Sequence, residues 1–459
     1  MKKFLALLLA LIMALSLVAC GSSNEEPAPT DEGEATEVVV PEGRIKVMYW
    51  SPYTGTSADF VDEIINEFNT MQDTYFVVRE FNGGYYDQIA KLMATEQKDL
   101  PALCNSSSET VGSYLHSGLI KNVQDYIDAD SSYNTKLYGN LLATYGVDGK
   151  LVGYPIGMSL SGFWYNKAIF AAAGIDPASL TSFDRVYDAA LKICEGGYAK
   201  YAIAEEHSGI WANYAFAREG FYCTDNNNGS TGLPTKCLYD DNSNGFANVV
   251  NNYYTKWADL ANKGYVYTIG AKIKDELIPA MAAGDLAMIV TTNSYRNRVV
   301  DAFGTGDCSG FGFIPMFSVT DNGKQTGYCS SGNGCFIVDN GDADAMQGAW
   351  EYIKYFTSVD VQLRWNTQTG YLPMYDEIMN DASYQEFLKT DDFTSTLIEA
   401  LQNSDSSAYY AFTATNNEYT TPGATCLEAV CNGTPVDQAI SDMCASINDA
   451  FTMYNATNK

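Results

Sequence analysis

Residues 44–50 read Arg-Ile-Lys-Val-Met-Tyr-Trp, a compact apolar run that predicts a buried strand. The run leads through residues 51–55, Ser-Pro-Tyr-Thr-Gly, into a segment with apolar residues at helical spacing. Those residues are Phe60, Val61, Ile64, Ile65 and Phe68. A second strand is predicted over residues 75–81 and a helix over residues 86–95. Strands that alternate with helices are typical of a parallel sheet, so we predict an α/β fold.

The same alternation returns after residues 153–159, Gly-Tyr-Pro-Ile-Gly-Met-Ser. We predict a short strand over 162–166, a helix over 168–173 that ends at Gly174, and an amphipathic helix over 182–194. Further helices are predicted over 249–261 and 350–356. The chain from residue 44 to its end is too long for one average domain and short for three, which favours two lobes.

The N-terminus has the pattern of an export signal. Lys2 and Lys3 precede an apolar stretch over residues 4–20 that is shorter than the roughly 20 residues of a spanning helix, and small Ala19 precedes Cys20. We predict a lipoprotein signal peptide over 1–19 and lipidation at Cys20; an ordinary secretory signal with a chance cysteine is the alternative. Residues 20–43 are rich in Ser, Glu, Pro, Ala and Thr and predict an acidic disordered tether.

The formal net charge is −29. Such a surface repels nucleic acid and anionic lipid headgroups, so we expect membrane contact through the lipid anchor only. The charge also argues against an anionic ligand, although a local basic pocket can override the global field. Its simplest role is to keep an exported protein soluble.

Eleven cysteines fit an oxidising compartment, and ten remain when Cys20 is set aside. Cys223 and Cys237 bracket a loop rich in Gly and Asn, and Cys426 and Cys431 bracket a shorter segment, so both pairs are candidate disulfides. One further pair is expected among Cys308, Cys329 and Cys335. The connectivity cannot be read from the sequence.

The sequence favours neither a metal site nor an enzyme. No Cys-x-x-Cys motif occurs, and neither of the two histidines has a cysteine at ligand spacing. Residues 240–245 match part of a calcium loop, but position twelve is Asn251 rather than Glu, and a turn before a helix explains the same residues. Residues 157–161 depart from Gly-x-Ser-x-Gly, and no glycine-rich phosphate loop is present. We therefore expect no cofactor and no catalysis.

Several motifs follow one another in a characteristic order. A strand ending in Tyr49-Trp50 is followed by Tyr165-Asn166-Lys167, by Ala-Gly-Asp-Leu-Ala-Met at 283–288, and by Thr-Gly-Tyr-Leu-Pro at 369–373. With the lipoprotein signal, this set resembles the extracellular solute-binding proteins of sugar-type ABC importers, which include maltose-binding and glycerol-3-phosphate-binding proteins. The resemblance implies a periplasmic-binding-protein-like fold, in which two α/β lobes enclose a ligand cleft at a hinge crossed three times.

Carried onto this chain, the resemblance places the crossings near 154–159, 328–332 and 370–373, where Gly and Pro cluster. The alternative is that some of these segments are turns inside one lobe. The implied N-terminal lobe holds 44–155 plus 331–371, and the implied C-terminal lobe holds 156–330 plus 372–459.

The glycerol-3-phosphate-binding branch looks most similar, and comparison with it implies a set of ligand-binding positions. They are Tyr86, Ser108 or Glu109, Ser159, Trp211, Thr292 or Asn293, Gly332 and Tyr371. That branch grips phosphate with a downstream arginine, whereas residues 411–423 contain no Arg or Lys. A guanidinium gives phosphate two charge-assisted hydrogen bonds, each worth roughly 1.5–3 kcal/mol, so its loss removes most phosphate affinity.

A neutral sugar or oligosaccharide is therefore the expected ligand. Trp50, Trp211, Tyr86 and Tyr371 offer aromatic faces, and Glu109, Asn293 and Ser159 offer hydrogen bonds, although each aromatic also suits a hydrophobic core. We expect a lipid-anchored monomer on the outer face of a bacterial membrane that delivers its sugar to the transmembrane subunits of an ABC permease. The alternatives are glycerol-3-phosphate or polyol binding by the same fold, a lipid-anchored glycan-acting enzyme, and a sugar-binding adhesion or sensory module.

Overall fold

The computed structural model of the chain describes residues 38–206, 209–267, 274–321, 323, 325–404 and 407–457. The predicted signal peptide, the lipidation site Cys20 and most of the predicted tether lie outside these residues. From Pro41 onward the chain forms one structural unit. In the described ranges, no helix is both long enough and apolar enough to cross a bilayer.

Within the described residues, nine strands form one sheet in the order β2-β1-β3-β11-β7-β9-β8, with β4 beside β11 and β10 beside β7. β1 is parallel to β2 and β3, and β8 is parallel to β9. The remaining pairs are antiparallel, and β5 and β6 form a separate ribbon. The strands are β1 (Ile45–Ser51), β2 (Tyr75–Phe81), β3 (Leu103–Ser107), β4 (Ile120–Lys121), β5 (Gly146–Val147), β6 (Lys150–Leu151), β7 (Tyr154–Asn166), β8 (Tyr201–Glu205), β9 (Leu286–Thr292), β10 (Phe311–Pro315) and β11 (Ser330–Val338).

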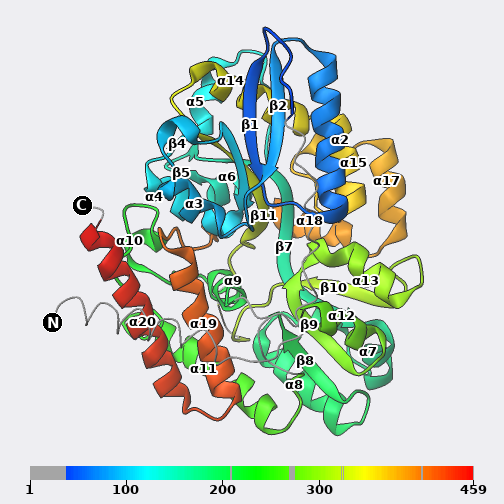
Figure 1. Ribbon diagram of the computed structural model, residues 1–459. Helices are drawn as coiled ribbons and strands as arrows, with labels where there is room; N and C mark the ends of the chain where they lie inside the picture. The colour runs from blue at the N-terminus through cyan, green and yellow to red at the C-terminus, as the bar shows by residue number, and fades with distance from the viewer. Residues whose placement is uncertain are drawn as a thin grey trace, which may run out of the picture. The chain divides into compact units, whose positions relative to one another are not determined.

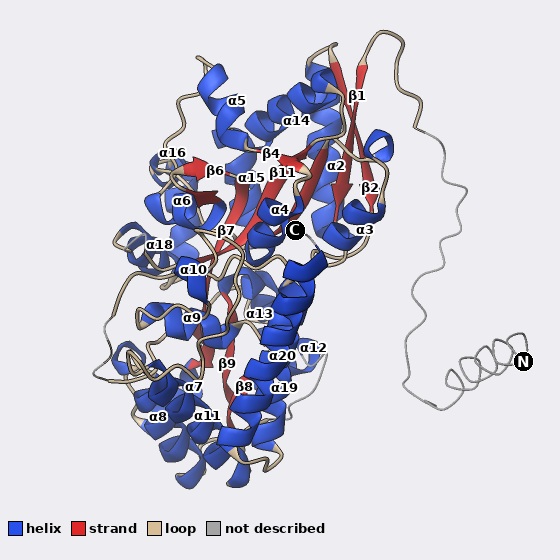
Figure 2. Cartoon of the chain, turned by 90° about the vertical axis from the view of Figure 1, so that its left-hand side faces the viewer, coloured by secondary structure: helices blue, strands red, loops and turns tan. Residues whose placement is uncertain are grey.

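Helices cover the sheet around both ends of β7 (Figure 1, Figure 2). From the N-terminus to the middle of the chain they are α2 (Gly55–Met71), α3 (Gln88–Ala94), α4 (Val111–Ser117), α5 (Val123–Ala129), α6 (Gly139–Tyr145), α7 (Lys167–Ala173), α8 (Phe183–Glu195), α9 (Trp211–Arg218), α10 (Asp225–Asn228) and α11 (Phe246–Asn262). The later helices are α12 (Lys274–Ala282), α13 (Arg296–Phe303), α14 (Ala343–Phe356), α15 (Val359–Thr369), α16 (Asp376–Met379), α17 (Ala382–Phe387), α18 (Thr394–Gln402), α19 (Asn416–Cys431) and α20 (Val436–Thr457).

The sequence periodicity located several of these elements well. All five apolar residues of the first predicted helix are buried on α2, and the predicted strand over 75–81 is β2. α8 begins after Ser182, whose hydroxyl accepts the N–H of Arg185, and α7 ends at Gly174 with φ of +59°. Two hydrophobic cores result, one built mainly on β1, β3 and β11 and the other on β8, α8 and α11.

β7 is longer than predicted and links the two cores. It spans thirteen buried residues rather than only 162–166. Its first half pairs with β11 and its second half with β9 and β10 (Figure 1). Pro155, Gly157 and the alternating serines weaken the strand signal in the sequence, because these residue types are depleted in strands. The neighbouring strands on both sides of β7 form hydrogen bonds with its backbone, and this pairing makes the segment a strand despite its low strand propensity.

The three predicted crossing segments lie side by side. Gly332 of β11 pairs with Met158 of β7, and the backbone N–H of Leu372 donates to the carbonyl of Met158 over 2.7 Å. Gly332 has φ of +129°, and a Cβ placed on it would lie 2.0 Å from the carbonyl oxygen of Gly157. Only glycine fits at this close approach of two backbones.

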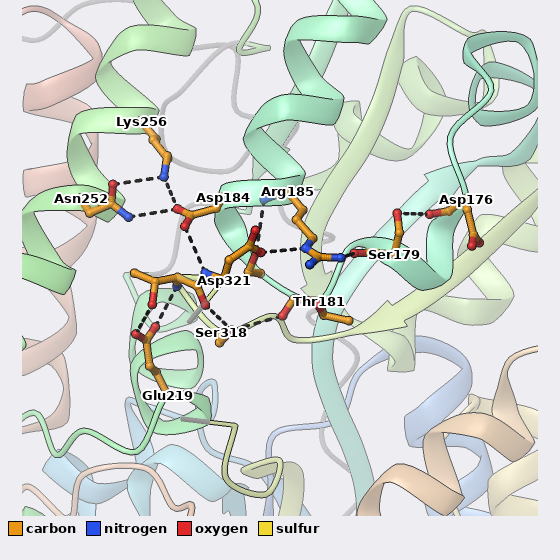
Figure 3. Close-up of polar contacts among 12 residues, drawn as sticks. Asp176, Ser179, Thr181, Asp184, Arg185, Glu219, Asn252, Lys256, Ser318 and Asp321 are labelled. Atoms are coloured by element: carbon orange, nitrogen blue, oxygen red, sulfur yellow. Dashed lines mark hydrogen bonds and ion pairs between the residues drawn. The ribbon is translucent and has the colours of Figure 1, made fainter. Parts of the chain in front are cut away.

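The connection from β10 to β11 is fixed by carboxylates (Figure 3). Glu219 accepts two successive backbone N–H groups of this connection, over 2.7 and 2.9 Å, and the hydroxyl of Thr320 over 2.6 Å. Asp184 of α8 accepts the N–H of Asp321 over 3.0 Å and pairs with Lys256 of α11. The chain that enters β11 is thereby tied to α8, α9 and α11.

None of the predicted disulfides is formed: the ten cysteines of the described residues are all free. Thr224 pairs directly with Cys237, which brings Cys223 and Cys237 near each other, but both remain free thiols. Cys426 and Cys431 lie five residues apart on α19, which places them about 140° apart around the helix.

The third expected pair, among Cys308, Cys329 and Cys335, is also absent. Cys329 directly precedes β11 and Cys335 lies six residues further along it, which is about 20 Å in an extended strand. Cys308 belongs to the core built on β1, whereas Cys329 belongs to the core built on β8. Proximity in sequence therefore did not bring these sulfur atoms together.

The calcium-like segment 240–245 is a turn before α11. The carboxylate of Asp241 accepts the N–H of Ser243 over 2.9 Å, a bond that lowers the pKa of Asp241. The amide oxygen of Asn244 accepts the N–H of Phe246, the first residue of α11, over 3.1 Å. The side-chain oxygens thus hold backbone N–H groups. In the described part of the chain, no group of three or more His, Cys, Asp or Glu side chains is arranged to hold a metal ion.

Candidate functional site

A cavity of about 640 Å³ opens beside the crossing segments. Its lining comes from the β1–α2 loop and the first turn of α2, from the start of α13 and the turn before it, and from the end of α15 with Tyr371. The lining residues are Pro52–Ser57, Phe60, Tyr85, Ser294, Tyr295, Asn297, Arg298, Gln368, Thr369 and Tyr371. The volume is that of a pocket for a small ligand.

Three tyrosines of this cavity converge on one amide. The Nδ2 atom of Asn333 donates to the hydroxyls of Tyr53 (3.2 Å), Tyr85 (3.1 Å) and Tyr371. An amide has only two N–H donors, so it cannot satisfy all three hydroxyls at once, and each hydroxyl keeps hydrogen-bonding capacity. Asn333 sits where the pairing of β11 with β7 shifts register, which turns its side chain toward the tyrosines.

Aromatic packing fixes these rings. The ring of Tyr371 stacks on Trp365, with centroids 5.6 Å apart and planes at 18°. Tyr53 meets the same indole edge-on at 5.6 Å and meets Tyr85 edge-on at 6.2 Å. The cavity therefore has a preorganised aromatic wall.

A buried carboxylate lies behind this wall. Glu109, which follows β3, is only 4% exposed and accepts hydrogen bonds from the hydroxyls of Ser107 and Tyr214. Burial raises the pKa of Glu109, and the hydrogen bond from Tyr214 opposes that rise. Since Tyr214 lies on α9, the carboxylate joins the end of β3 to the helix that begins with Trp211.

Tyrosines from separate elements surround Glu109. Burial, followed by the negative charge of Glu109, raises the pKa of Tyr86, Tyr145, Tyr214 and Tyr410. All four therefore stay protonated at neutral pH and act as hydrogen-bond donors. A carboxylate ringed by neutral phenols is suited to a ligand rich in hydroxyl groups.

Several hydroxyls in this region have no partner among the described residues. They are buried and belong to Tyr145, Tyr410 and Thr413. The hydroxyl of Ser108 lies against Glu109, whose pKa it helps to lower. An unpaired buried hydroxyl costs roughly 1–3 kcal/mol, so a concentration of them is expected where a ligand supplies the missing bonds. After burial, Glu109, Tyr371 and Tyr85 are among the groups that raise the pKa of Tyr145, which places the buried cluster next to the aromatic wall.

Four of the positions implied by the sequence meet in this region: Tyr371 lines the cavity, and Tyr86, Ser108 and Glu109 form the buried cluster. Trp211 lies beside them, with its ring centroid 6.0 Å from that of Tyr214. Its indole N–H already donates to the carbonyl of Glu206 over 2.9 Å.

The other predicted positions hold the crossing segments together. The hydroxyls of Ser159 and Ser331 bond each other over 2.8 Å, joining β7 to β11. Asn293 accepts the N–H of Leu160 over 2.7 Å and donates to the carbonyl of Gly370 over 3.0 Å. Their polar atoms are thus engaged with the hinge rather than directed at the cavity.

The remaining three positions are also engaged in the fold. Thr292 caps the short turn Asn293–Tyr295, and Gly332 packs against Gly157. Trp50 is buried in the core built on β1, with the ammonium of Lys91 5.4 Å from its ring. The expectation that Trp50 stacks on ligand has no support in this packing.

Sequence reasoning missed Tyr53, Tyr85, Asn333, Tyr214 and Arg298. A signal existed for Tyr53, because it follows a strand with parallel neighbours, and ligands of α/β sheets bind at the carboxyl ends of such strands. Tyr85 stands beside the predicted Tyr86. Nothing in the sequence marks Arg298, whose guanidinium is exposed at the mouth and pairs with Asp275 over 3.2 Å.

The protein-family comparison matches residues 63–394 to the family described as bacterial extracellular solute-binding protein. The chain belongs to this family. Among curated relatives, it is 25% identical to the sn-glycerol-3-phosphate-binding periplasmic protein of Agrobacterium fabrum over 360 residues, covering 74% of this chain and 78% of that one. It is 24% identical to the Yersinia pestis protein of the same name, covering 72% and 74%.

Solved structures of solute-binding proteins share the fold. The sugar-binding protein MalE from Xanthomonas citri has a TM-score of 0.71 at 15% identity, covering 90% of this chain and 99% of that one. The GacH receptor of Streptomyces glaucescens, solved also with acarbose, gives 0.69 at 16%, covering 88% and 97%. UgpB from Mycobacterium tuberculosis, in complex with glycerophosphocholine, gives 0.68 at 18%, covering 90% and 99%.

The fold predicted from the sequence is therefore confirmed: this extracellular solute-binding protein has the periplasmic-binding-protein-like fold. Its relatives and structural neighbours are binding proteins of transporters rather than enzymes.

Proposed function

We propose that this solute-binding protein captures a neutral sugar or oligosaccharide and delivers it to the transmembrane subunits of an ABC permease. One observation carries the proposal: a preorganised aromatic wall adjoins a buried carboxylate ringed by phenols and by hydroxyls without partners. Sugars present apolar C–H faces to aromatic rings and several hydroxyls to acceptors and donors. The aromatic wall therefore suits the sugar faces, and the buried carboxylate with its surrounding hydroxyls suits the sugar hydroxyls.

Each group has a role in this proposal. Tyr53, Tyr85 and Tyr371 pack against sugar faces in the cavity. Glu109 accepts sugar hydroxyls, and the hydroxyls of Ser108 and Tyr410 supply the remaining bonds. Glu109 bonds Tyr214, so ligand captured there links the end of β3 to α9. Binding then favours a closed arrangement of the lobes.

Glycerol phosphate is the second candidate, favoured by the names of the curated relatives and by Arg298 in the cavity wall. The first turn of α2 also faces the cavity, and its N-cap residue Thr54 makes no side-chain capping bond. Two observations weigh against an anion: Arg298 shares its charge with Asp275, and residues 411–423 contain no basic side chain.

The lobes we propose hold 44–155 plus 331–371 and 156–330 plus 372–459. The adjacency of β7, β11 and the segment at Leu372 supports three hinge crossings at the predicted places. We also propose that a lipid at Cys20 anchors the mature monomer outside the cell, as the sequence of residues 1–20 indicates.

Calorimetric titration with two groups of ligands tests the proposed ligand class. The first group holds neutral monosaccharides and oligosaccharides, and the second holds glycerol-3-phosphate, glycerophosphocholine and polyols. We expect saturable binding within the first group. Binding confined to the phosphate esters would refute the neutral-sugar proposal, and turnover of a glycan would reveal an enzyme.

Two variants make the test specific. Glu109→Gln keeps the shape of the side chain but removes its charge, and we expect at least about tenfold weaker sugar binding, since hydrogen bonds to charged groups are worth about 1.5–3 kcal/mol. Arg298→Gln should change sugar affinity less than about twofold, because its guanidinium is exposed and already paired. The opposite ranking of the two variants would favour the phosphate ester.

A further inference from the structure

Two buried cysteines that are far apart in sequence have their sulfur atoms in contact. The Sγ atoms of Cys237 and Cys444 lie 3.6 Å apart, although 207 residues separate them along the chain. Cys444 lies on α20, and Cys237 closes the loop that follows α10. One turn further along α20, the amide oxygen of Asn448 accepts the backbone N–H of Cys237 over 2.7 Å. A backbone contact therefore already holds the loop against the helix.

We propose that Cys237 and Cys444 form a disulfide in the exported protein, and that this bond ties the loop over 223–237 to the C-terminal helix. The inference rests on the extracellular placement of the family, because disulfides persist in oxidising compartments. The two sulfur atoms are in contact, and they have to approach further to reach the S–S bond length of about 2.0 Å.

The oxidant is an external disulfide, borne by a thiol–disulfide oxidoreductase or a small molecule. The thiolate of one cysteine attacks it and releases one thiol, which leaves a mixed disulfide. The thiolate of the second cysteine then displaces the other half. Two thiols of the chain thus lose two protons and two electrons, and the external disulfide becomes two thiols. Both cysteines are buried in the fold, so the exchange belongs to the stage when the exported chain is still folding.

Cys223 is the competing partner. The sequence spacing favours its pairing with Cys237, and Cys223 is one of the groups that raise the pKa of Cys237, after burial and Cys444. The sulfur atom of Cys444, however, is the one in contact with that of Cys237. The tertiary structure thus selects the distant partner over the neighbour in sequence.

The cross-linked loop supports the proposed ligand site. Within it, the carbonyl of Asn228 accepts the N–H of Phe412 over 2.9 Å, and the Asn228 amide donates to the carbonyl of Tyr409 over 3.0 Å. Tyr410, whose hydroxyl belongs to the buried cluster, lies between these two contacts. A covalent link from α20 to the loop therefore stiffens the support of Tyr410.

Peptide mapping of the exported protein tests the bond. The protein is purified without reductant, its free thiols are alkylated, and its proteolytic peptides are analysed by mass spectrometry before and after reduction. We expect one peptide pair that joins Cys237 to Cys444 and separates on reduction. Alkylation of both residues as free thiols, or a link between Cys223 and Cys237, would overturn the proposal.

Variants separate the bond from packing effects. Cys444→Ser should abolish the linked pair, whereas Cys223→Ser, the matched control, should retain it. Reductant should lower the melting temperature of the wild-type protein and of the Cys223→Ser protein by a few degrees, because a long closed loop constrains the unfolded chain. Reductant should leave the Cys444→Ser protein unchanged. An equal response of all three proteins to reductant would contradict a Cys237–Cys444 bond.

Discussion

At the scale of single residues, the site depends on side chains whose ionisation the fold controls. Glu109 illustrates this, because burial raises its pKa, and its negative charge in turn raises the pKa of Tyr86 and Tyr410. A second acidic residue, Glu205 at the end of β8, is also 4% exposed. The hydroxyl of Tyr253 donates to it over 3.1 Å.

Glu205 predicts a pH dependence of stability. Burial, assisted by the neighbouring charge of Glu206 and opposed by the Tyr253 hydrogen bond, raises the pKa of Glu205 to about 8. Its pKa in the unfolded chain is near 4.3, so the native state holds a proton that the unfolded state releases between those values. The stabilisation from this group is fully present below about pH 4 and is lost as pH rises toward 8.

Urea unfolding of the wild type and of Glu205→Gln at pH 5 and pH 8 measures this effect. Glutamine cannot ionise, so the Glu205→Gln protein lacks this pH dependence. Its free energy of unfolding relative to that of the wild type should therefore increase from pH 5 to pH 8, by on the order of 4 kcal/mol. Exposed Glu386→Gln is the control and should show no comparable change. A constant difference between Glu205→Gln and wild type at both pH values would show that Glu205 is ionised throughout.

At the scale of elements, the crossing strands are set by backbone contact. Gly332 meets Gly157 so closely that β7 and β11 cannot accept a side chain there. Gly157, one of the residues that hid β7 from a strand assignment, is also required by packing, because a Cβ on it would lie 3.0 Å from Trp365 and from Tyr371. At this position the weak strand signal and the tight packing around the crossing therefore have the same cause.

Gly332→Ala should destabilise the protein strongly, by about 3 kcal/mol or more, because the added Cβ meets a backbone oxygen and φ is positive. Gly433→Ala is a matched control with φ of +93° and nothing within 4 Å of the added Cβ, and it should cost only about 1 kcal/mol. Thermal unfolding of both variants provides the comparison. Equal losses would mean that backbone strain alone, without the steric contact, determines the cost.

At the scale of the whole molecule, the net charge of −29 dominates the long-range field. A neutral ligand does not feel this field, whereas an anion is repelled by the protein as a whole and attracted only locally by Arg298. Salt screens both effects, with a Debye length of about 10 Å at 0.1 M. Ionic strength therefore distinguishes the two ligand classes without any mutation.

Binding of the neutral sugar should change less than about twofold between 0.02 and 0.5 M salt. Calorimetric titration at both salt concentrations measures it, with the net charge of the protein unchanged. A change of tenfold or more would show that charge contributes substantially to recognition and would favour an anionic ligand.

Local patterns in the sequence were sufficient for the fold class and for several of the helices. The apolar spacing of α2 and α8 and the capping residues Ser182 and Gly174 act over a few residues, and their physics does not depend on distant parts of the chain. The order of motifs was also enough to indicate the solute-binding family. Glu109 and Tyr371 were found because they stand at recognisable positions in that order.

The tertiary structure alone decided which polar side chains are left for a ligand. Ser159 and Asn293 match the family pattern, but their side chains form hydrogen bonds within the crossing segments. Asn333 meets Tyr53 and Tyr85 only because β11 lies between β3 and β7 in the sheet. Cysteine contacts followed the same rule, because α20 brings Cys444 into contact with Cys237, a residue 207 positions away along the chain. Sequence spacing reports neighbours along the chain, but hydrogen bonding and sulfur contact depend on neighbours in space.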